Sequence, residues 1–369
     1  MQKTRQYQYL LKPDLKQKEE IVQLFGATRF VYNRFLDDRN SGKLKSALAK
    51  EVVADYLRRY PFLNHVNSSA LIHTIFQAQD QIRSLKRYRR RSDSCCSFTV
   101  GNLIRKPIRI LDDHRILIPD LGPVEMIYHR PIPTDGEIKK ATVIRRADGK
   151  YYVSVTVTTK TVSRRRDLDP AKSIGIDYSS TYFYVDDKGD RIRMPHFYKE
   201  KESAIAALDQ MMSQCIKGSN NYYKLKTKRA EIFAGIKNRR KDFLHKLSTQ
   251  LAEAYDVVCI EDIDMKEISQ NPHLGKRTYD NAFGEFTEML KYKLEERGKI
   301  LLKAERSFPS SKICSKCGSI NRKMTIEDRV WKCPDCGTVH DRDVNAAINI
   351  KNRCLMIYFG RRAFGSGLS

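Results

Sequence analysis

Residues 314–350 read CSKCGSINRKMTIEDRVWKCPDCGTVHDRDVNAAINI, and this stretch carries the most specific signals in the chain. Its first part holds two CxxC pairs, Cys314–Cys317 and Cys333–Cys336, with fifteen residues between them. Four thiolates at this spacing can surround one Zn²⁺ tetrahedrally, and the glycine after each pair suits a tight turn. A redox-active dithiol is the alternative. We expect a structural zinc ribbon over residues 307–340, whose surrounding lysines and arginines contact the target nucleic acid.

The second part of the stretch, HDRDVNAAINI at 340–350, follows the ribbon directly. We expect a helix to begin at Asp343 and to pack closely on a sheet, because two small alanines follow. Two more carboxylates, Asp177 and Glu261, end short apolar runs that are typical of buried strands. Taken singly, an acidic residue in such a place is more often a cap than a catalyst.

Taken together, the three carboxylates are a stronger signal. In an RNase-H-like sheet, the ends of the two strands and the start of the late helix meet at one edge. Such a cluster of hard oxygen ligands binds two Mg²⁺, or Mn²⁺, about 4 Å apart. A scissile phosphodiester is the group that requires this pair of ions. We therefore predict Asp177, Glu261 and Asp343 as catalytic, metal-binding residues.

The rest of the second half alternates strands and helices, which implies a mixed α/β core. We expect strands at Ser173–Asp177, Tyr182–Val185, Asp256–Glu261 and Ile300–Leu302. Helices are expected over 201–255, interrupted at Gly218–Asn220, and over Phe283–Arg297.

The first half has a different character. Lys3–Leu11 alternates like a strand, and Asp14 is placed to cap a helix with apolar residues at three- and four-residue spacing. A second helix is expected from Asn67. Short alternating segments separated by Pro and Gly over 98–160 predict a small antiparallel barrel or sandwich, and 163–167 reads as a linker.

Composition points to a nucleic-acid partner. The 369 residues include 69 Lys+Arg against 44 Asp+Glu, a net charge of +25, which a polyanion would balance. The sequence has no apolar run long enough to cross a membrane, and its first residues are too polar for a secretory signal. Nine cysteines without such a signal indicate a reducing compartment, so we expect a protein of the cytosol that does not bind membranes.

Two basic clusters are candidates for contacts with phosphate groups. One lies at the end of the second helix, and the other lies within the long helical segment: Arg83, Lys86, Arg87, Arg89 and Arg90, then Lys237, Arg239, Arg240, Lys241 and Lys246. The alternatives are a solvated helix end, where the helix dipole favours cations, and a solvated cationic face.

The chain resembles the TnpB (OrfB) family of bacterial insertion sequences, relatives of the type V CRISPR effector nucleases. The matching segments run from the first helix almost to Gly360, and the most specific of them is the ribbon followed by HDRDxNAAxNI. They are Gly26–Asn33, Gly175–Asp177, Asn238–Leu247, Ile260–Asp262, Ser310–Lys312, the four cysteines and Asp341–Ala347.

The resemblance implies a split RuvC-like nuclease (RNase H fold) at 171–306 and 341–369, with Asp177, Glu261 and Asp343 as its metal ligands and the zinc ribbon inserted. It also implies a wedge-type β-barrel at 1–12 and 100–170, interrupted by a helical recognition module at 13–99.

The implied activity is RNA-guided cleavage of double-stranded DNA beside a short transposon-adjacent motif. The guide would be a noncoding RNA transcribed from the transposon end, and we expect a monomeric ribonucleoprotein. Two alternatives stay open. One is a nuclease-silent, RNA-guided DNA-binding regulator, and the other is an unguided RNase-H-fold transposase or nuclease. Silent relatives lose carboxylates, whereas this chain retains all three.

Overall fold

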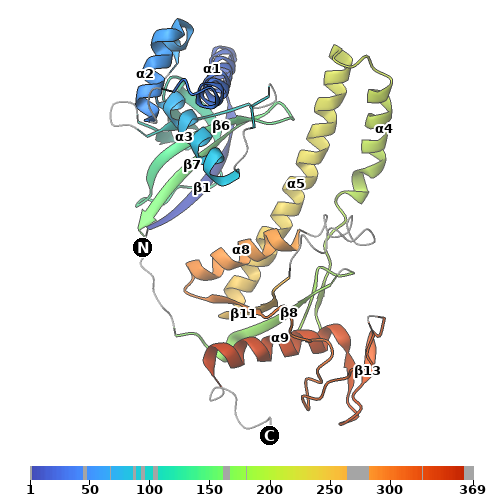
Figure 1. Ribbon diagram of the computed structural model, residues 1–369. Coiled ribbons are helices and arrows are strands. Elements are labelled where there is room, and N and C mark those ends of the chain that lie inside the picture. Colours follow the sequence, from blue (N-terminus) through green and yellow to red (C-terminus); the bar gives the residue numbers. More distant parts are fainter. Residues whose placement is uncertain are drawn as a thin grey trace. The chain divides into compact units, whose positions relative to one another are not determined.

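The computed structural model describes residues 2–44, 48–66, 68–85, 89–92, 96–102, 107–160, 167–179, 181–263, 282–325 and 327–360. The chain divides into two compact units, Met1–Val162 and Ser163–Ser369 (Figure 1). Each unit has its own sheet and its own core.

The first unit is built on one seven-stranded antiparallel sheet. Its strands are β1 (Gln2–Lys12), β2 (Ser97–Gly101), β3 (Arg109–Asp112), β4 (Arg115–Ile118), β5 (Gly122–Ile127), β6 (Glu137–Arg145) and β7 (Tyr151–Lys160), in the order β2-β6-β7-β1-β5-β4-β3. Strand β1 is central, because it pairs with β7 along nearly its whole length and with β5 at its end. Its alternate residues Tyr7, Tyr9 and Leu11 are buried in the core.

This sheet refines the predicted barrel or sandwich. It is one sheet and not two layers, and among the described residues no pairing joins β2 to β3 to close it into a barrel. The first strand after the helices begins at Ser97, slightly before the expected boundary at 100.

Between β1 and β2 the chain forms a helical insertion. It contains α1 (Leu15–Asn40), α2 (Ala49–Arg59), a short 3₁₀ helix (Pro61–His65) and α3 (Ser68–Leu85). Helix α1 begins as expected, since the Asp14 carboxylate accepts the Gln17 N–H and the Gln17 side chain accepts the Asp14 N–H. The helices bury a second apolar cluster between them, centred on residues such as Phe35, Tyr56 and Leu71. Helix α2 was not predicted from the sequence.

The second unit contains a mixed five-stranded sheet in the order β10-β9-β8-β11-β12. Its strands are β8 (Ser173–Tyr178), β9 (Tyr184–Asp186), β10 (Arg191–Ile192), β11 (Val257–Glu261) and β12 (Ile300–Ala304). Strands β8, β11 and β12 are parallel, whereas β8, β9 and β10 pair antiparallel. The mixed α/β core expected from the sequence is therefore confirmed.

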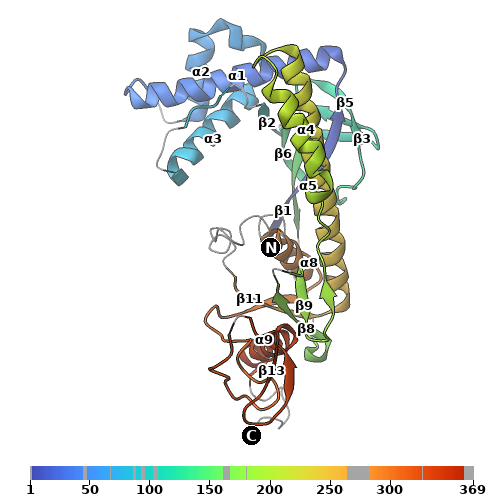
Figure 2. The ribbon, with the colours of Figure 1, turned by 90° about the vertical axis from the view of Figure 1, so that its right-hand side faces the viewer.

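Helices cover both faces of this sheet. Helices α4 (Glu202–Ser213) and α5 (Asn220–Ala254) form a long hairpin (Figure 2), and α5 packs with α8 (Phe283–Glu296) on the face that holds Val258 and Ile260. The other face, with Val257 and Cys259, is covered by α9 (Arg342–Phe359). Because β11 is buried on both sides, it reads as a continuous apolar run.

The ribbon precedes α9 in the chain. It contains the hairpin β13 (Val330–Lys332) and β14 (Val339–Asp341), and an isolated bridge between Ile313 and Ile320. Its small core consists of Cys314, Met324, Trp331 and Cys333. Across the described residues, no helix is long and apolar enough to span a membrane.

Candidate active site and candidate metal centre

Asp177 and Glu261 lie at the same edge of the second sheet. They follow Ile176 and Ile260, which are paired neighbours on the parallel strands β8 and β11. Because the carboxyl ends of adjacent parallel strands meet at one edge, the fold places these two carboxylates side by side. Strand β11 ends at Glu261 as predicted, and β8 continues one residue beyond Asp177, to Tyr178.

Asp343 is brought to the same place by α9. Gly175 of β8 lies against the backbone of Ala347, one helical turn after Asp343, so the helix crosses the sheet at close range. One detail differs from our expectation. The helix begins at Arg342, and Asp341 is its N-cap, accepting the Val344 N–H at 3.0 Å. Asp343 is thus not needed as a cap, and its carboxylate is available for other contacts.

The charges of Glu261 and Asp343 both act on Asp177. The pKa of Asp177 is raised well above its usual range, first by burial and then by the negative charges of Glu261 and Asp343, with Arg342 opposing the shift. The pKa of Glu261 is also raised, by burial. The neighbouring negative charges disfavour ionisation of a clustered carboxyl group. A bound divalent cation offsets that repulsion, so such a cluster favours binding of a cation.

Two arginines hold the Asp343 carboxylate. Arg342 donates to Oδ1 at 3.1 Å, and Arg329, from the ribbon, lies 3.5 Å from Oδ2. Neither arginine was predicted from the sequence as part of the site. Arg342 could have been, because it lies in the HDRDVNAAINI segment directly before Asp343. Among the described residues, the four ribbon cysteines are the only group that brings at least three ligand atoms within 4.8 Å of one another. The ligand atoms of the three carboxylates are therefore spread more widely than those of the cysteines.

The four ribbon cysteines form a compact cluster that fits zinc. The Sγ atoms of Cys314 and Cys336 are 3.6 Å apart, as are those of Cys317 and Cys333. A tetrahedral Zn²⁺ with bonds of about 2.3 Å requires sulfur atoms about 3.8 Å apart. The backbone N–H of Cys336 is the first cause that lowers the pKa of Cys333, to about 6, which favours the metal-binding thiolate. The predicted ligand set is thus brought together.

Two further ribbon residues support this cluster. His340 Nε2 lies 3.0 Å from Cys314 Sγ, and its ring packs against Trp331 with centroids 4.8 Å apart. Trp331 is buried, so this indole is part of the ribbon core and is not an exposed platform for bases. The contact of His340 with Cys314 was not predicted, because the spacing of a histidine from two CxxC pairs does not by itself indicate that it lies beside the metal site.

The basic cluster on α5 has two kinds of member. Arg239 pairs with Glu200 at 2.6 Å and Lys246 pairs with Asp242 at 2.7 Å, whereas Lys237 and Lys241 are exposed and have no ion pair among the described residues. Arg240 is half-buried. The helix therefore presents two lysines as the most available cations of the predicted set.

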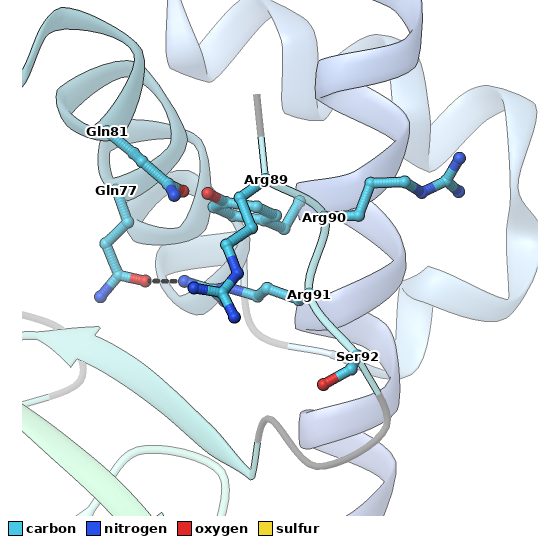
Figure 3. A pocket seen from close by; sticks show the side chains of 7 residues that line it. Gln77, Gln81, Arg89, Arg90, Arg91 and Ser92 are labelled. Atoms are coloured by element: carbon cyan, nitrogen blue, oxygen red, sulfur yellow. Dashed lines mark hydrogen bonds between the residues drawn. The ribbon is translucent and has the colours of Figure 1, made fainter. Parts of the chain in front are cut away.

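Two members of the first basic cluster, Arg89 and Arg90, line a polar cavity of about 260 Å³ between α1 and α3 (Figure 3). Its wall includes Arg89, Arg90, Gln77 and Gln81, and Arg90 also pairs with Asp37 at 3.2 Å. Lys86 and Arg87 lie outside the described residues, and Arg83 is exposed at the end of α3 near Asp80.

Arg91, the last residue of the same basic run, also lines this cavity. Its guanidinium lies 4.0 Å from the Tyr32 ring centroid and donates to Gln77 at 2.7 Å (Figure 3). The Asn33 side chain accepts the Arg91 N–H and donates to the Arg91 carbonyl, so this loop is fixed to α1.

Three family models match successive parts of the chain. "Helix-turn-helix domain" of OrfB_IS605 matches residues 1–42, "Probable transposase" of OrfB_IS605 matches 152–271, and "Cas12f1-like, TNB domain" matches 283–350. The stretch matched by the first model forms a strand and one helix here, β1 and α1, and not two helices.

The fold of the chain is similar to that of a solved RNA-guided effector protein. A solved structure titled "Cryo-EM structure of the Cas12f1-sgRNA-target DNA complex" matches with a TM-score of 0.58 at 13% identity, covering 95% of this chain and 99% of that chain. The chain therefore has the fold of a type V effector. A Streptomyces pristinaespiralis protein, "Putative RNA-guided DNA endonuclease", is 30% identical over 94% of this chain and 88% of its own length. "Putative RNA-guided DNA endonuclease InsQ" of Escherichia coli is 24% identical over 95% of this chain and 92% of its own length. The chain belongs to the TnpB (OrfB) family, which is related to the type V effectors.

Proposed function

We propose that the protein is an RNA-guided DNA endonuclease of an insertion sequence. The observation that carries this proposal is the junction of β8, β11 and α9, where the charges of Glu261 and Asp343 act on Asp177. Burial and these two acids, which come from distant parts of the chain, raise the pKa of Asp177, an arrangement that costs stability unless cations join it.

The strand order supports a RuvC-like assignment for this unit. Three antiparallel strands followed by two parallel ones, in the order β10-β9-β8-β11-β12, match an RNase H sheet. We assign residues 171–306 and 341–369 to this nuclease domain and 307–340 to the zinc ribbon. The sheet at 1–12 and 100–170 is the wedge region, and 13–99 is the recognition module.

The three carboxylates would hold two Mg²⁺ or Mn²⁺ ions, which lower the pKa of water and stabilise the departing 3′ oxygen. Asp177 at the end of β8, Glu261 at the end of β11 and Asp343 in the first turn of α9 would together supply the carboxylate ligands. For Asp343 to act as a ligand, its carboxylate must share or exchange its contacts with Arg342 and Arg329. Those two cations then remain beside a site that receives a phosphate group.

The guide RNA and double-stranded target DNA are the proposed partners, and the ribonucleoprotein is proposed to be a monomer in the bacterial cytoplasm. The net charge of +25 provides the attraction for backbone phosphates. Base pairing with the guide supplies specificity for the target sequence, and the protein reads the duplex shape and a short adjacent motif. The four cysteines would hold one structural Zn²⁺ in the ribbon.

The test is cleavage of a plasmid by protein that is co-expressed with RNA from the transposon end. We expect Mg²⁺-dependent cutting that follows a new guide when the 3′ segment of the RNA is changed. Protein that binds the matched plasmid but never cuts it would support the silent regulator. Equal cutting of the same site without RNA would support an unguided nuclease.

A further inference from the structure

Helix α9 grips the segment that leads into the first zinc knuckle. Asn345 Oδ1 accepts the Ser315 N–H at 2.9 Å, and its Nδ2 donates to the Ile313 carbonyl at 2.7 Å. One turn later, Asn349 Nδ2 donates to the carbonyls of Ser310 and Ile313, at 2.8 and 2.6 Å. Ser315 lies inside the Cys314–Cys317 turn, so the contact reaches the metal centre itself.

The side-chain amides of both asparagines are buried. Asn345 is 1% exposed and Asn349 is 6% exposed. The backbone groups they bind belong to an irregular segment that has no sheet to satisfy them. Truncating either side chain would leave buried N–H or C=O groups unpaired, which is unfavourable. The two asparagines therefore fix the position of this segment on α9.

A second connection approaches Asp343 from the other direction. Strand β14 runs directly into α9, and its His340 contacts Cys314 Sγ at 3.0 Å. The Arg342 N–H donates to the Arg329 carbonyl at 2.9 Å, which ties the first residue of α9 to the ribbon again. The ribbon thus holds the first turns of α9 before and after Asp343.

We propose that Asn345 and Asn349 are positioning residues that couple the zinc centre to the carboxylate centre. A filled zinc site would fix the Ser310–Ser315 segment. Through the two asparagines, that segment would fix the rotation and depth of α9, and with them the place of Asp343. Coupling of this kind is reciprocal, so a loosened clamp weakens both sites. The inference rests on the proposed nuclease function of Asp343.

The experiment compares Asn345→Ala and Asn349→Ala with Asn352→Ala. Asn352 is an exposed residue of the same helix, so it controls for loss of an asparagine from α9. Zinc release is followed with the chelating dye 4-(2-pyridylazo)resorcinol in the full-length protein bound to its guide RNA. Plasmid cleavage is then measured across a series of Mg²⁺ concentrations.

For both clamp variants we expect zinc release about 10-fold faster than wild type. We also expect a half-saturating Mg²⁺ concentration raised about 5- to 10-fold, within the usual range of coupling between sites. Cutting at saturating Mg²⁺ should stay near wild type, and Asn352→Ala should behave as wild type. A purely structural defect would instead lower the active fraction without changing the Mg²⁺ dependence.

Wild-type zinc release and wild-type Mg²⁺ dependence in both clamp variants would overturn the inference. If Asn345→Ala does not fold, Asn349→Ala decides the question, because it removes two hydrogen bonds one turn further from Asp343. If wild-type protein with its guide does not cut DNA, the proposed function fails. The zinc-release comparison still reports on the clamp in that case, so the two failures are distinguishable.

Discussion

Gly175 of strand β8 and Ala347 of helix α9 are in contact through their backbones. A Cβ atom at position 175 would overlap the Ala347 carbonyl oxygen and would also meet the Lys351 side chain at 2.7 Å. Lys351 in turn donates to Asp187 at 2.8 Å, and Asp187 accepts the Gly175 N–H at 2.9 Å. The approach of helix to strand therefore has no room for a methyl group, and this approach sets the distance between Asp177 and Asp343.

Gly175→Ala should destabilise the protein by about 1–3 kcal/mol, the usual cost of overpacking, and should lower DNA cleavage further than stability alone explains. Urea unfolding and single-turnover cleavage measure the two effects. Gly235→Ala is the control, because nothing lies within 4 Å of a Cβ at that exposed position of α5. It should leave cleavage unchanged and stabilise the helix by up to about 1 kcal/mol. Unchanged stability and cutting in Gly175→Ala would show that α9 can move outward freely.

Glu261→Gln and Asp343→Ala should each reduce cleavage about 1,000-fold or more, because each removes a charged oxygen from a site that must neutralise two divalent ions. Guide RNA should copurify with both variants as with wild type, since neither residue belongs to the basic clusters. Asp14→Ala serves as a control that removes an acid from the cap of α1. Near-normal cutting by Asp343→Ala would exclude this residue from the site.

Asp177→Asn should abolish cleavage yet make the protein more stable in buffer without Mg²⁺. The native pKa of Asp177 is raised, so the native state holds this proton more tightly than the unfolded chain does. Stability is therefore lost as pH rises from the ordinary carboxyl range through the raised pKa, and Asn removes that loss. Thermal unfolding of the wild type and the variant, with zinc retained, should be compared at pH 5 and pH 8. The increase in Tm caused by Asp177→Asn should be larger at pH 8, and each kcal/mol of added stability corresponds to roughly 2–4 °C. An equal or smaller gain at pH 8 would contradict the electrostatic account.

Cys333→Ser should release the bound zinc and unfold the ribbon, because its core consists of only four buried hydrophobic side chains, two of them ligands. Metal analysis of purified protein should give one zinc per wild-type chain and much less in the variant. Cys215→Ser is the matched control, since Cys215 lies in the segment between α4 and α5 and not in the cluster. Freshly purified wild-type protein that contains no zinc would refute the assignment.

The double variant Lys237→Ala/Lys241→Ala should weaken RNA binding and reduce the dependence of log affinity on log salt by about 1.5 units. Both lysines are exposed and lack an ion pair among the described residues. Arg229→Ala/Arg239→Ala removes the same charge from α5, but these arginines are paired with Asp209 and Glu200. Filter binding at several salt concentrations compares the two double variants. If both weaken RNA binding equally, the lysines contribute only to the overall positive potential of the protein and make no local contact with RNA.

The sequence predicted much of the second unit because its signals are local. The short apolar runs that end in Asp177 and Glu261 are typical of buried strands, and the two CxxC pairs have a spacing with few other uses. The start of α9 was missed by one residue. Asp341 and Asp343 are both acceptable caps, and only the hydrogen bond from Val344 distinguishes them.

Contacts between distant residues were beyond reach of the sequence. The pairing of Arg329 with Asp343 and the clamp formed by Asn345 depend on how the ribbon folds back on α9. Helix α2, by contrast, could have been predicted, because its buried residues Ala49, Val52, Val53 and Tyr56 recur at three- and four-residue spacing. Whether the first sheet closes into a barrel or stays open could not be predicted. Closure depends on the twist and tilt of the strands, whereas alternation of apolar residues shows only that strands are present.

The position of Asp343 in the chain also governs when the site can form during synthesis. Asp343 is made 166 residues after Asp177, which at 5–20 residues per second means a delay of roughly 10–30 s. Until α9 leaves the ribosome, Val257 and Cys259 on one face of β11 have no cover, and the third carboxylate is absent. On the proposed function, a nascent chain would hold RNA through its earlier basic helices well before it could damage DNA. The order of the sequence itself would act as a safeguard for the cell that makes the protein.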